Sequence, residues 1–336
     1  CIRDRAKERA MRVVYPQGND PRIIRAARRV RDEGIAAPIV LGDIVAIERT
    51  AKDLEIPLDE IELLNPQDAV NHRQRYAPLL FETRRRKGMA LDDANRAIFD
   101  PNMFAAMMLK TEDADAMLGG LTTYYADTLR PALQVLPLEH GRSIVSALYI
   151  VMVEGRPFFF ADCAVNIRPT AAELAEIALS AAAAALHDFD VSPRVAMISY
   201  SNFGSAGGEE PERVREAVRI CNEKAPDLPL DGEMHVDTAI RASLLEKRHP
   251  FNRLGGPANV LVFPDLAAAN GAYQLMHHMA GAQVIGPILT GTSKSVHVAQ
   301  RDAEVGDIVN LTAIAVLDAQ RKSRNSTLAA EIERSF

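Results

Sequence analysis

The first part of the chain alternates short apolar runs with amphipathic stretches. Arg12–Tyr15 predicts a strand, and residues 20–35 repeat apolar side chains at helical spacing. Asp20 followed by Pro21 is typical of the first positions of a helix. Pro38–Leu41 then predicts a second strand. A strand, a helix and a strand in this order predict two parallel strands joined by a right-handed crossover.

The middle of the chain departs from this rhythm. Residues 144–163 hold two adjacent strand-like runs joined by Glu154-Gly155-Arg156, a turn that favours a hairpin. Strand, loop and helix then alternate again, with apolar strands predicted at Val195–Tyr200 and Asn259–Phe263. The hairpin is the main break in the pattern, so we expect a domain boundary near residue 141.

Length and composition agree with two globular domains. The chain has 336 residues, of which 48% are apolar and 25% charged. A net charge of −6 and the absence of Trp argue against a nucleic-acid partner. No run approaches the roughly 18 apolar residues of a membrane span, so no membrane association is expected. Three widely spaced cysteines favour a reducing cytoplasm, and the start at Cys1 instead of Met suggests a piece of a longer polypeptide.

The stretch from Gly286 to Asp307, GPILTGTSKSVHVAQRDAEVGD, carries the first candidate chemistry. An apolar strand signal is followed by small and hydroxyl residues, by Lys294 and by Arg301, and it ends at Asp307 where a helix is predicted. Hydroxyls, backbone N–H groups and two cations suit an anion such as phosphate. This stretch therefore predicts an anion-binding site.

A second candidate is the loop 201–208, which follows a predicted strand and precedes a helix. Its small residues would let the backbone approach an oxyanion, with Ser201, Asn202 and Ser205 as candidate ligands. An ordinary strand-to-helix turn explains the loop equally well.

The remaining polar clusters have simpler explanations. The basic run Arg84–Lys87 is typical of a solvated helix end, although one of its members could point into a cleft. Asp127 before Arg130 reads as a helix cap in a loop of the kind that binds ligands. The carboxylates of Asp231–Asp237 favour caps and salt links over a metal site, so no metal is expected.

About ten segments in order, among them RVVYPQG, RRRKGM, DTLRPALQV, SNFGS and GPILTG, resemble the phosphate acetyltransferase/phosphate butyryltransferase family. The chain resembles more closely the phosphotransacetylase-like C-terminal domain of bacterial NADP-dependent malic enzymes. The resemblance implies two three-layer α/β domains of the isocitrate/isopropylmalate dehydrogenase type with an interdomain cleft. The last helix would return to the first domain, giving residues 1–141 plus 300–336 and residues 142–299.

The resemblance also assigns site positions. The family's enzymes transfer acetyl between acetyl phosphate and coenzyme A, using a Ser-Arg-Gly motif, an Asp six residues after that Arg, and two further arginines. Gln300, Arg301, Asp302 and Asp307 stand at the motif and Asp positions, and the further arginines correspond to Arg84 and Arg130. The resemblance implies that the arginines hold the phosphoryl group and that the Asp assists deprotonation of the thiol.

Gln300 and Asp302 depart from the motif, so no catalytic residue is expected in this domain. We expect a regulatory domain that senses acetyl-CoA, holds no cofactor, and supports a homo-oligomer, with a dimer expected. An N-terminal malic-enzyme part, using NADP and Mg²⁺ or Mn²⁺, would oxidatively decarboxylate malate. The alternatives are an active phosphate acetyltransferase or a purely assembling domain. The predicted ligand-binding residues are Arg84, Arg130, Ser201, Asn202, Ser205, Lys294, Arg301 and Asp307.

Overall fold

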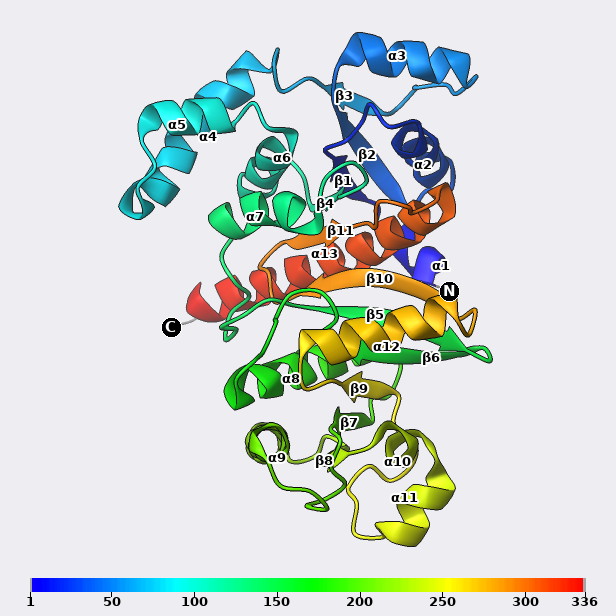
Figure 1. Cartoon of the computed structure of the whole chain (residues 1–336). Coiled ribbons are helices and arrows are strands. Elements are labelled where there is room, and N and C mark those ends of the chain that lie inside the picture. Colours follow the sequence, from blue (N-terminus) through cyan, green and yellow to red (C-terminus); the bar gives the residue numbers. More distant parts are fainter. Residues whose placement is uncertain (1, 335–336) are drawn as a thin grey trace. The chain divides into compact units, whose positions relative to one another are not determined.

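The computed structural model describes the backbone of residues 2–334 and the side chains of residues 2–324. The chain forms two compact units, one made of Cys1–Glu139 with Thr292–Phe336 and the other of His140–Gly291 (Figure 1). We predicted that residues 292–299 belong with the second domain. They lie in the first unit because residues 295–298 pair with a strand of its sheet.

The first unit contains a five-stranded sheet in which every neighbouring pair is parallel. The strand order is β11-β4-β1-β2-β3. The strands are β1 Met11–Tyr15, β2 Ala36–Leu41, β3 Glu62–Leu64, β4 Ala116–Gly119 and β11 Ser295–Val298. From β1 the chain builds outward first through β2 and β3 and then through β4 and β11. In such a sheet ligands bind where the order reverses, outside the carboxyl ends of the strands.

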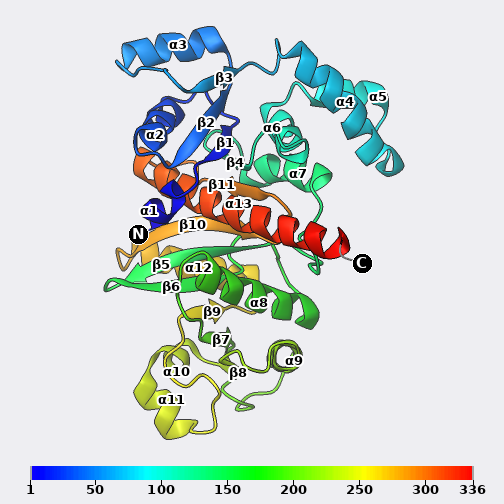
Figure 2. The same ribbon diagram turned by 180° about the vertical axis from the view of Figure 1, so that it is seen from behind.

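Helices cover this sheet. They are α1 Ile2–Lys7, α2 Pro21–Asp32, α3 Ile44–Asp53, α4 Val70–Arg84, the 3-10 turn η1 Arg85–Lys87, α5 Leu91–Ala97, α6 Pro101–Lys110, α7 Tyr125–Val135 and α13 Val305–Arg334. Asp20 caps α2 by accepting from the Arg22 N–H at 2.9 Å, which confirms the predicted helix start. Helix α13 packs beside α1 and α2 (Figure 2), and the buried Tyr15 hydroxyl meets Thr312 of α13 at 2.9 Å.

The second unit contains a mixed six-stranded sheet in the order β10-β5-β6-β9-β7-β8. The strands are β5 Ser146–Val153, β6 Arg156–Ala161, β7 Val195–Ile198, β8 Leu230–Met234, β9 Val260–Val262 and β10 Gln283–Thr290. Strands β5 and β6 form the predicted hairpin, with Glu154 and Gly155 at φ 50° and 76° in its turn. Strand β10 adds to β5 in antiparallel orientation, whereas β6, β9, β7 and β8 run parallel.

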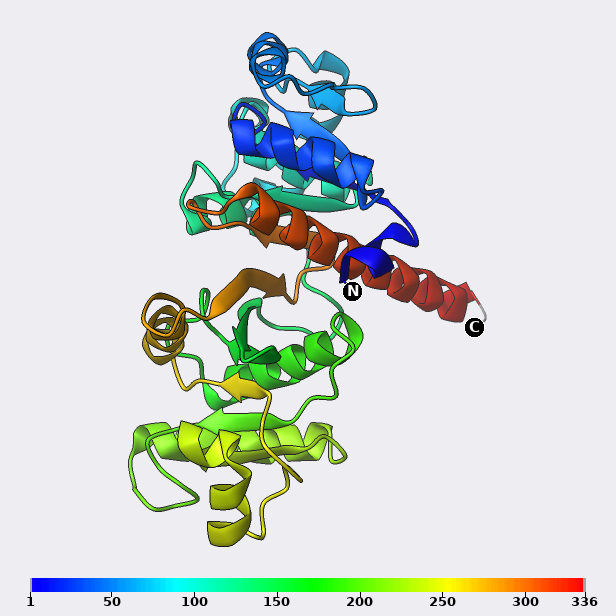
Figure 3. The ribbon, with the colours of Figure 1, turned by 90° about the vertical axis from the view of Figure 1, so that its right-hand side faces the viewer.

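The helices of the second unit are α8 Ala171–His187, α9 Glu209–Lys224, α10 Val236–Ile240, α11 Ala242–Arg248 and α12 Leu266–His278. Thr170 and Glu173 form a capping box at the start of the alanine-rich α8, which packs against α9. Figure 3 shows α8 and α12 on opposite faces of the sheet. No helix in the described part of the chain is long and apolar enough to cross a membrane.

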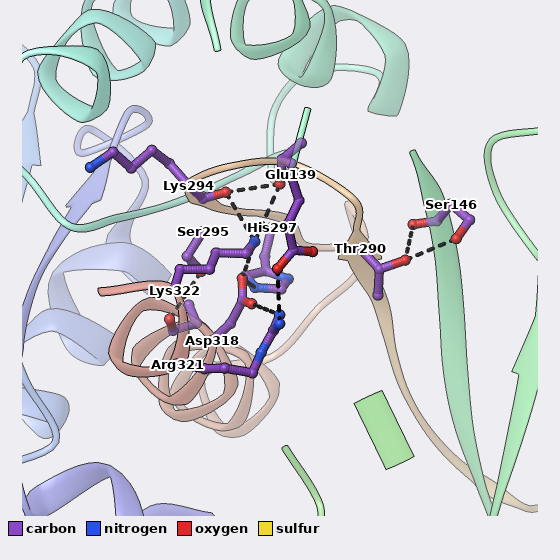
Figure 4. A network of polar contacts seen from close by, with 11 residues as sticks. Glu139, Ser146, Thr290, Lys294, Ser295, His297, Asp318, Arg321 and Lys322 are labelled. Atoms are coloured by element: carbon purple, nitrogen blue, oxygen red, sulfur yellow. Dashed lines mark hydrogen bonds and ion pairs between the residues drawn. The ribbon is translucent and has the colours of Figure 1, made fainter. Parts of the chain in front are cut away.

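A buried ionic network joins α13 to β11 in the first unit (Figure 4). Asp318, 4% exposed, accepts from the Lys322 Nζ at 2.7 Å and from the Arg321 Nη2 at 2.6 Å. Arg321 also reaches the Glu139 Oε1 at 3.1 Å, and the buried His297 Nε2 lies 3.6 Å from Asp318. Burial raises the pKa of Asp318, but the neighbouring Lys322, His297 and Arg321 more than offset it and hold that pKa well below its usual range.

Candidate functional site at the carboxyl edge of the first sheet

The loops that follow β1, β2, β4 and β11 meet at the carboxyl edge of the first sheet. The Gly18 N–H donates to the Leu41 carbonyl at 2.8 Å, which ties the loop after β1 to the end of β2. The Ala299 N–H donates to the Gly119 carbonyl at 2.7 Å, which ties the chain after β11 to β4. These bonds place four loops at the position where open parallel sheets bind ligands.

A cavity of about 510 Å³ lies at this edge, at the starts of α2 and α6. Gln17 lines this cavity. Its Nε2 donates to the Asn102 Oδ1 at 2.9 Å, and its Oε1 accepts from the Gly120 N–H at 3.1 Å. Gly120 has φ 107°, and a Cβ there would lie 2.5 Å from the carbonyl oxygen of Ala299. Only glycine therefore lets the loops after β4 and β11 approach this closely.

Arg301 lies in the turn that follows β11. Its guanidinium sits over the ring of Tyr124, 5.3 Å from the ring centre, a cation–π distance. Its carbonyl accepts from the Arg22 Nη1 at 2.8 Å, and Arg22 is fixed in turn by Asp20 at 2.8 Å. The backbone of the turn is therefore held from α2 while the exposed Arg301 side chain faces the loop before α7.

Asp307 occupies the first turn of α13. Its Oδ2 accepts from the Glu304 N–H at 3.0 Å, so one carboxylate oxygen caps the helix and the residue stays exposed. Gln300 starts the turn that leads to it, with its carbonyl accepting from the Ala303 N–H at 3.1 Å. Asp302 is exposed and, after the larger contribution of Asp20, helps to raise the pKa of Arg22.

The two other predicted arginines lie on neighbouring helices. Arg130 of α7 pairs with Asp127 at 3.5 Å, and both side chains are more than half exposed. An exposed pair of this kind contributes at most about 1 kcal/mol, so Arg130 can exchange its partner for a ligand anion. Arg84 ends α4, which packs against α7. The Arg84 Nε–H is buried and has no hydrogen-bond partner among the described residues.

Lys294 does not lie at the carboxyl edge with Arg301. It precedes β11, whereas Arg301 follows it, so the two cations of one sequence stretch lie at opposite edges of the sheet. The Lys294 Nζ is paired with the Glu112 Oε1 at 2.9 Å.

The hydrogen-bond donors of the loop at residues 201–208 in the second unit are bound by other groups of the chain. The buried Glu233 Oε1 accepts from the Ser201 hydroxyl at 2.8 Å and from the Gly204 N–H at 2.7 Å. Asn202 accepts from the His235 N–H at 2.8 Å, and Ser205 accepts from the Asn202 N–H at 2.8 Å. The polar atoms that suggested a phosphate loop thus bind groups of the chain itself, which is the turn alternative.

The acidic stretch at 231–237 takes part in similar local bonds. Asp231 accepts from the N–H groups of Gly232 and Arg253, and Glu233 also pairs with Arg215 at 2.9 Å. Within the described residues no group of three or more His, Cys, Asp or Glu side chains is placed to hold a metal ion.

Three residues at the carboxyl edge were not predicted from the sequence. Gln17 and Arg22 fix the loops, and Tyr124 lies under Arg301. The run Pro16–Asp20 directly after a strand was a detectable signal for Gln17, because loops at that position line ligand sites. Nothing local marks Tyr124, whose partner is remote in sequence.

The fold and the site define a two-unit α/β protein with cationic side chains at the carboxyl edge of its first sheet. A family model described as phosphate acetyl/butaryl transferase matches residues 1–316. The chain belongs to this family.

Similar proteins from other organisms are named phosphate acetyltransferases. The chain is 37% identical over 319 residues to the phosphate acetyltransferase of Helicobacter pylori, covering 95% of this chain and 61% of that protein. It is 37% identical over 322 residues to that of Clostridium acetobutylicum, covering 94% and 96%. The chain thus spans less than two thirds of the first relative and nearly all of the second. Among solved structures, a phosphotransacetylase from Streptococcus pyogenes matches with a TM-score of 0.88 and 34% identity, covering 95% of this chain and 97% of that one.

These matches correct the functional expectation from the sequence. The relatives are phosphate acetyltransferases, and nothing in them supports a malic enzyme. The interpretation as a regulatory domain of an NADP-dependent malic enzyme was therefore wrong. The oxidoreductase activity, the NADP and divalent-metal requirement and the malic-enzyme partner domains that it implied are wrong with it. Gln300 and Asp302 depart from the family motif, but similarity along almost the whole chain outweighs these two positions.

Proposed function

We propose that the chain is a phosphate acetyltransferase, which transfers an acetyl group between acetyl phosphate and coenzyme A. The observation that carries the proposal is the match to the Clostridium acetobutylicum enzyme across 96% of that protein's length. Arg84, Arg130, Arg301 and Asp307 support it, since each stands at a position that the family resemblance links to the reaction.

In the proposed reaction the sulfur of coenzyme A attacks the carbonyl carbon of acetyl phosphate. A C–S bond forms, the C–O bond to the phosphoryl group breaks, and inorganic phosphate leaves. Arg301 and Arg130 are exposed guanidiniums suited to bidentate binding of that phosphoryl group. The Nε–H of Arg84, which has no described partner, is a third donor for an anion.

Asp307 supplies the base in this proposal. Its Oδ2 is engaged by the Glu304 N–H, which orients the carboxylate, and its Oδ1 takes the thiol proton. Thiolate is the nucleophilic form of sulfur, so removing this proton starts the transfer.

Gln300 and Asp302 are both expected to lower the rate of acetyl transfer. Asp302 places a negative charge next to Arg301, where it opposes an incoming phosphate. Gln300 replaces a Ser of the family motif, and loss of a well-placed donor costs on the order of 10²–10³ in rate. We expect a Gln300→Ser, Asp302→Gly double variant to exceed the unmodified protein in kcat by about tenfold or more.

The deciding experiment measures acetyl-CoA formation from acetyl phosphate and coenzyme A by absorbance of the thioester. Turnover above about 1 s⁻¹, the low end for ordinary enzymes, supports the proposal. A purified, folded chain without turnover in either direction would refute the proposal. A fully active Arg301→Ala variant would leave the activity standing and refute the role given to Arg301.

Arg84 allows a matched comparison. Arg84→Ala is expected to lower kcat/KM at least tenfold, whereas Arg85→Ala, which removes the neighbouring arginine paired with Glu82, leaves it within about twofold. Equal effects of the two substitutions would show that only the general charge of the basic run matters.

The finer assignments remain part of the proposal. We place the two units in the isocitrate/isopropylmalate dehydrogenase type, in a cytosolic protein that forms a dimer. Acyl-CoA enters this scheme as a substrate. Sedimentation of the purified chain tests the dimer.

A further inference from the structure

The amino edge of the first sheet carries a second cavity. Its volume is about 560 Å³, and it is bordered by residues before or at the start of β1, β4 and β11 and by the middle of α13. Every lining residue belongs to the first unit. A cavity of this volume lies within the range of small-molecule sites.

Two ion pairs line this cavity. The Arg12 guanidinium donates two hydrogen bonds to Asp115, of 3.1 Å from Nε and 2.8 Å from Nη2. Lys294 binds Glu112 at 2.9 Å. The lining residues Glu112 and Asp115 are thus both engaged by cations of the same cavity.

Three further cations of the lining are not matched by these carboxylates. Lys110 donates to the Val135 carbonyl at 3.0 Å, and neither it nor the exposed Arg9 has a carboxylate partner among the described contacts. Lys322 closes the cavity from α13, with its side chain 6% exposed and its Nζ on Asp318. The positive charge of the lining therefore exceeds its negative charge.

Several polar contacts hold Lys322 at this wall (Figure 4). Besides Asp318, its Nζ reaches the Lys294 carbonyl at 3.2 Å and the Thr292 Oγ1 at 3.4 Å. The chain segment that presents Lys294 to the cavity is therefore held in place by α13. A pre-formed wall with surplus cations favours an anionic ligand because less ordering is needed on binding.

We propose that this cavity is a second anion site, distinct from the carboxyl edge, for a phosphorylated metabolite of up to nucleotide size. Lys294 of this cavity directly precedes β11, and the proposed acetyl-transfer residues Arg301 and Asp307 lie after that strand. The two sites are thus separated by the length of the strand. Arg9 and Lys110 supply uncompensated charge, and Lys294 can leave Glu112 for the ligand.

Inorganic pyrophosphate tests the site by titration calorimetry in low salt. The Arg301→Ala variant is used to weaken binding at the carboxyl edge, so that acetyl transfer and the second site are separated. In that background we expect one pyrophosphate per chain. The double substitution Arg9→Met, Lys110→Met is expected to weaken it at least tenfold. Lys52→Met, an exposed lysine on α3 outside the cavity, is expected to change it less than twofold.

Glu112→Gln gives a result in the opposite direction. Its side chain is 75% exposed, so the substitution leaves the fold intact, and it frees Lys294 from its carboxylate. We expect pyrophosphate to bind several-fold more tightly. No binding to the Arg301→Ala chain, equal binding after the Arg9 and Lys110 substitutions, or weaker binding by Glu112→Gln would each overturn the second site. None of these results bears on whether the chain transfers acetyl groups.

Discussion

Replacing Asp318 by Asn tests whether the buried network holds α13 in the first unit. The carboxylate of Asp318 is the shared partner of Lys322 at 2.7 Å and Arg321 at 2.6 Å. Asn keeps the size of the side chain but removes the charge and turns one acceptor into a donor that faces a cation.

The magnitude follows from what each cation retains. Arg321 is 25% exposed and keeps Glu139 at 3.1 Å. Lys322 is 6% exposed and keeps only the neutral oxygens of Lys294 and Thr292, at 3.2 and 3.4 Å. The loss is therefore concentrated on one buried ammonium, and breaking a buried pair from one side costs about 3–5 kcal/mol.

Urea unfolding followed by far-UV circular dichroism measures the change in the free energy of unfolding. A second variant, Asp318→Leu with Lys322→Met, removes both charges and is expected to recover most of the loss, because an apolar pair of similar volume is often neutral. If Asp318→Asn cost less than about 1 kcal/mol, or if the double variant were no better than the single one, the electrostatic account of this network would be wrong.

The pH dependence gives an independent check with a defined sign. Because the folded-state pKa of Asp318 is depressed, its contribution is present above the unfolded-state pKa of about 3.9 and is lost as pH falls below it. The difference in unfolding free energy between the unmodified chain and Asp318→Asn should thus stay constant from pH 7 to about 5 and shrink towards pH 3. A difference independent of pH down to 3 would contradict the assignment.

Three further predictions concern other parts of the molecule. Glu233→Gln should destabilise the second unit by about 1–3 kcal/mol in thermal unfolding, since it weakens the buried acceptor that closes the 201–208 loop. An unchanged transition would contradict this. Gly120→Ala should lower both the melting temperature and the acetyl-transfer rate, because its Cβ would lie 2.5 Å from a carbonyl oxygen; normal values of both would show that the loops can shift apart. Burial raises the pKa of Cys221 to about 12 and that of Cys163 well above its usual range. In a Cys1→Ser variant a disulfide reagent at pH 8 should therefore react slowly until the chain unfolds, and rapid labelling of the folded chain would refute it.

Local signals predicted the local elements well. The capping pair at Asp20 and Pro21 and the turn at Glu154 and Gly155 depend on neighbours in the sequence, and the structure confirms both. The pairing of β11 with β4 could not be predicted in the same way, because nothing near residue 295 specifies which sheet a short apolar strand joins. For this reason the prediction assigned residues 292–299 to the second unit, whereas they lie in the first.

The candidate site shows the same limit. Lys294 and Arg301 are seven positions apart in the sequence, and their shared charge suggested one anion site. A strand advances about 3.3 Å per residue, so the first and last residues of the four-residue β11 already lie about 10 Å apart. At Ser201 the type of residue was informative, but the partner was an internal carboxylate from β8 that spacing does not reveal.

The discontinuity of the first unit has a consequence for synthesis on the ribosome. The second unit is a continuous segment, His140–Gly291, so its sheet can close as soon as that segment has emerged. The first unit at that moment still lacks β11 and α13, which leaves the edge of β4 unpaired and Tyr15 without its Thr312 partner. An unpaired strand edge is a template for misassembly. The part of the chain that is made first is therefore completed last, after β11 and α13 have left the ribosome.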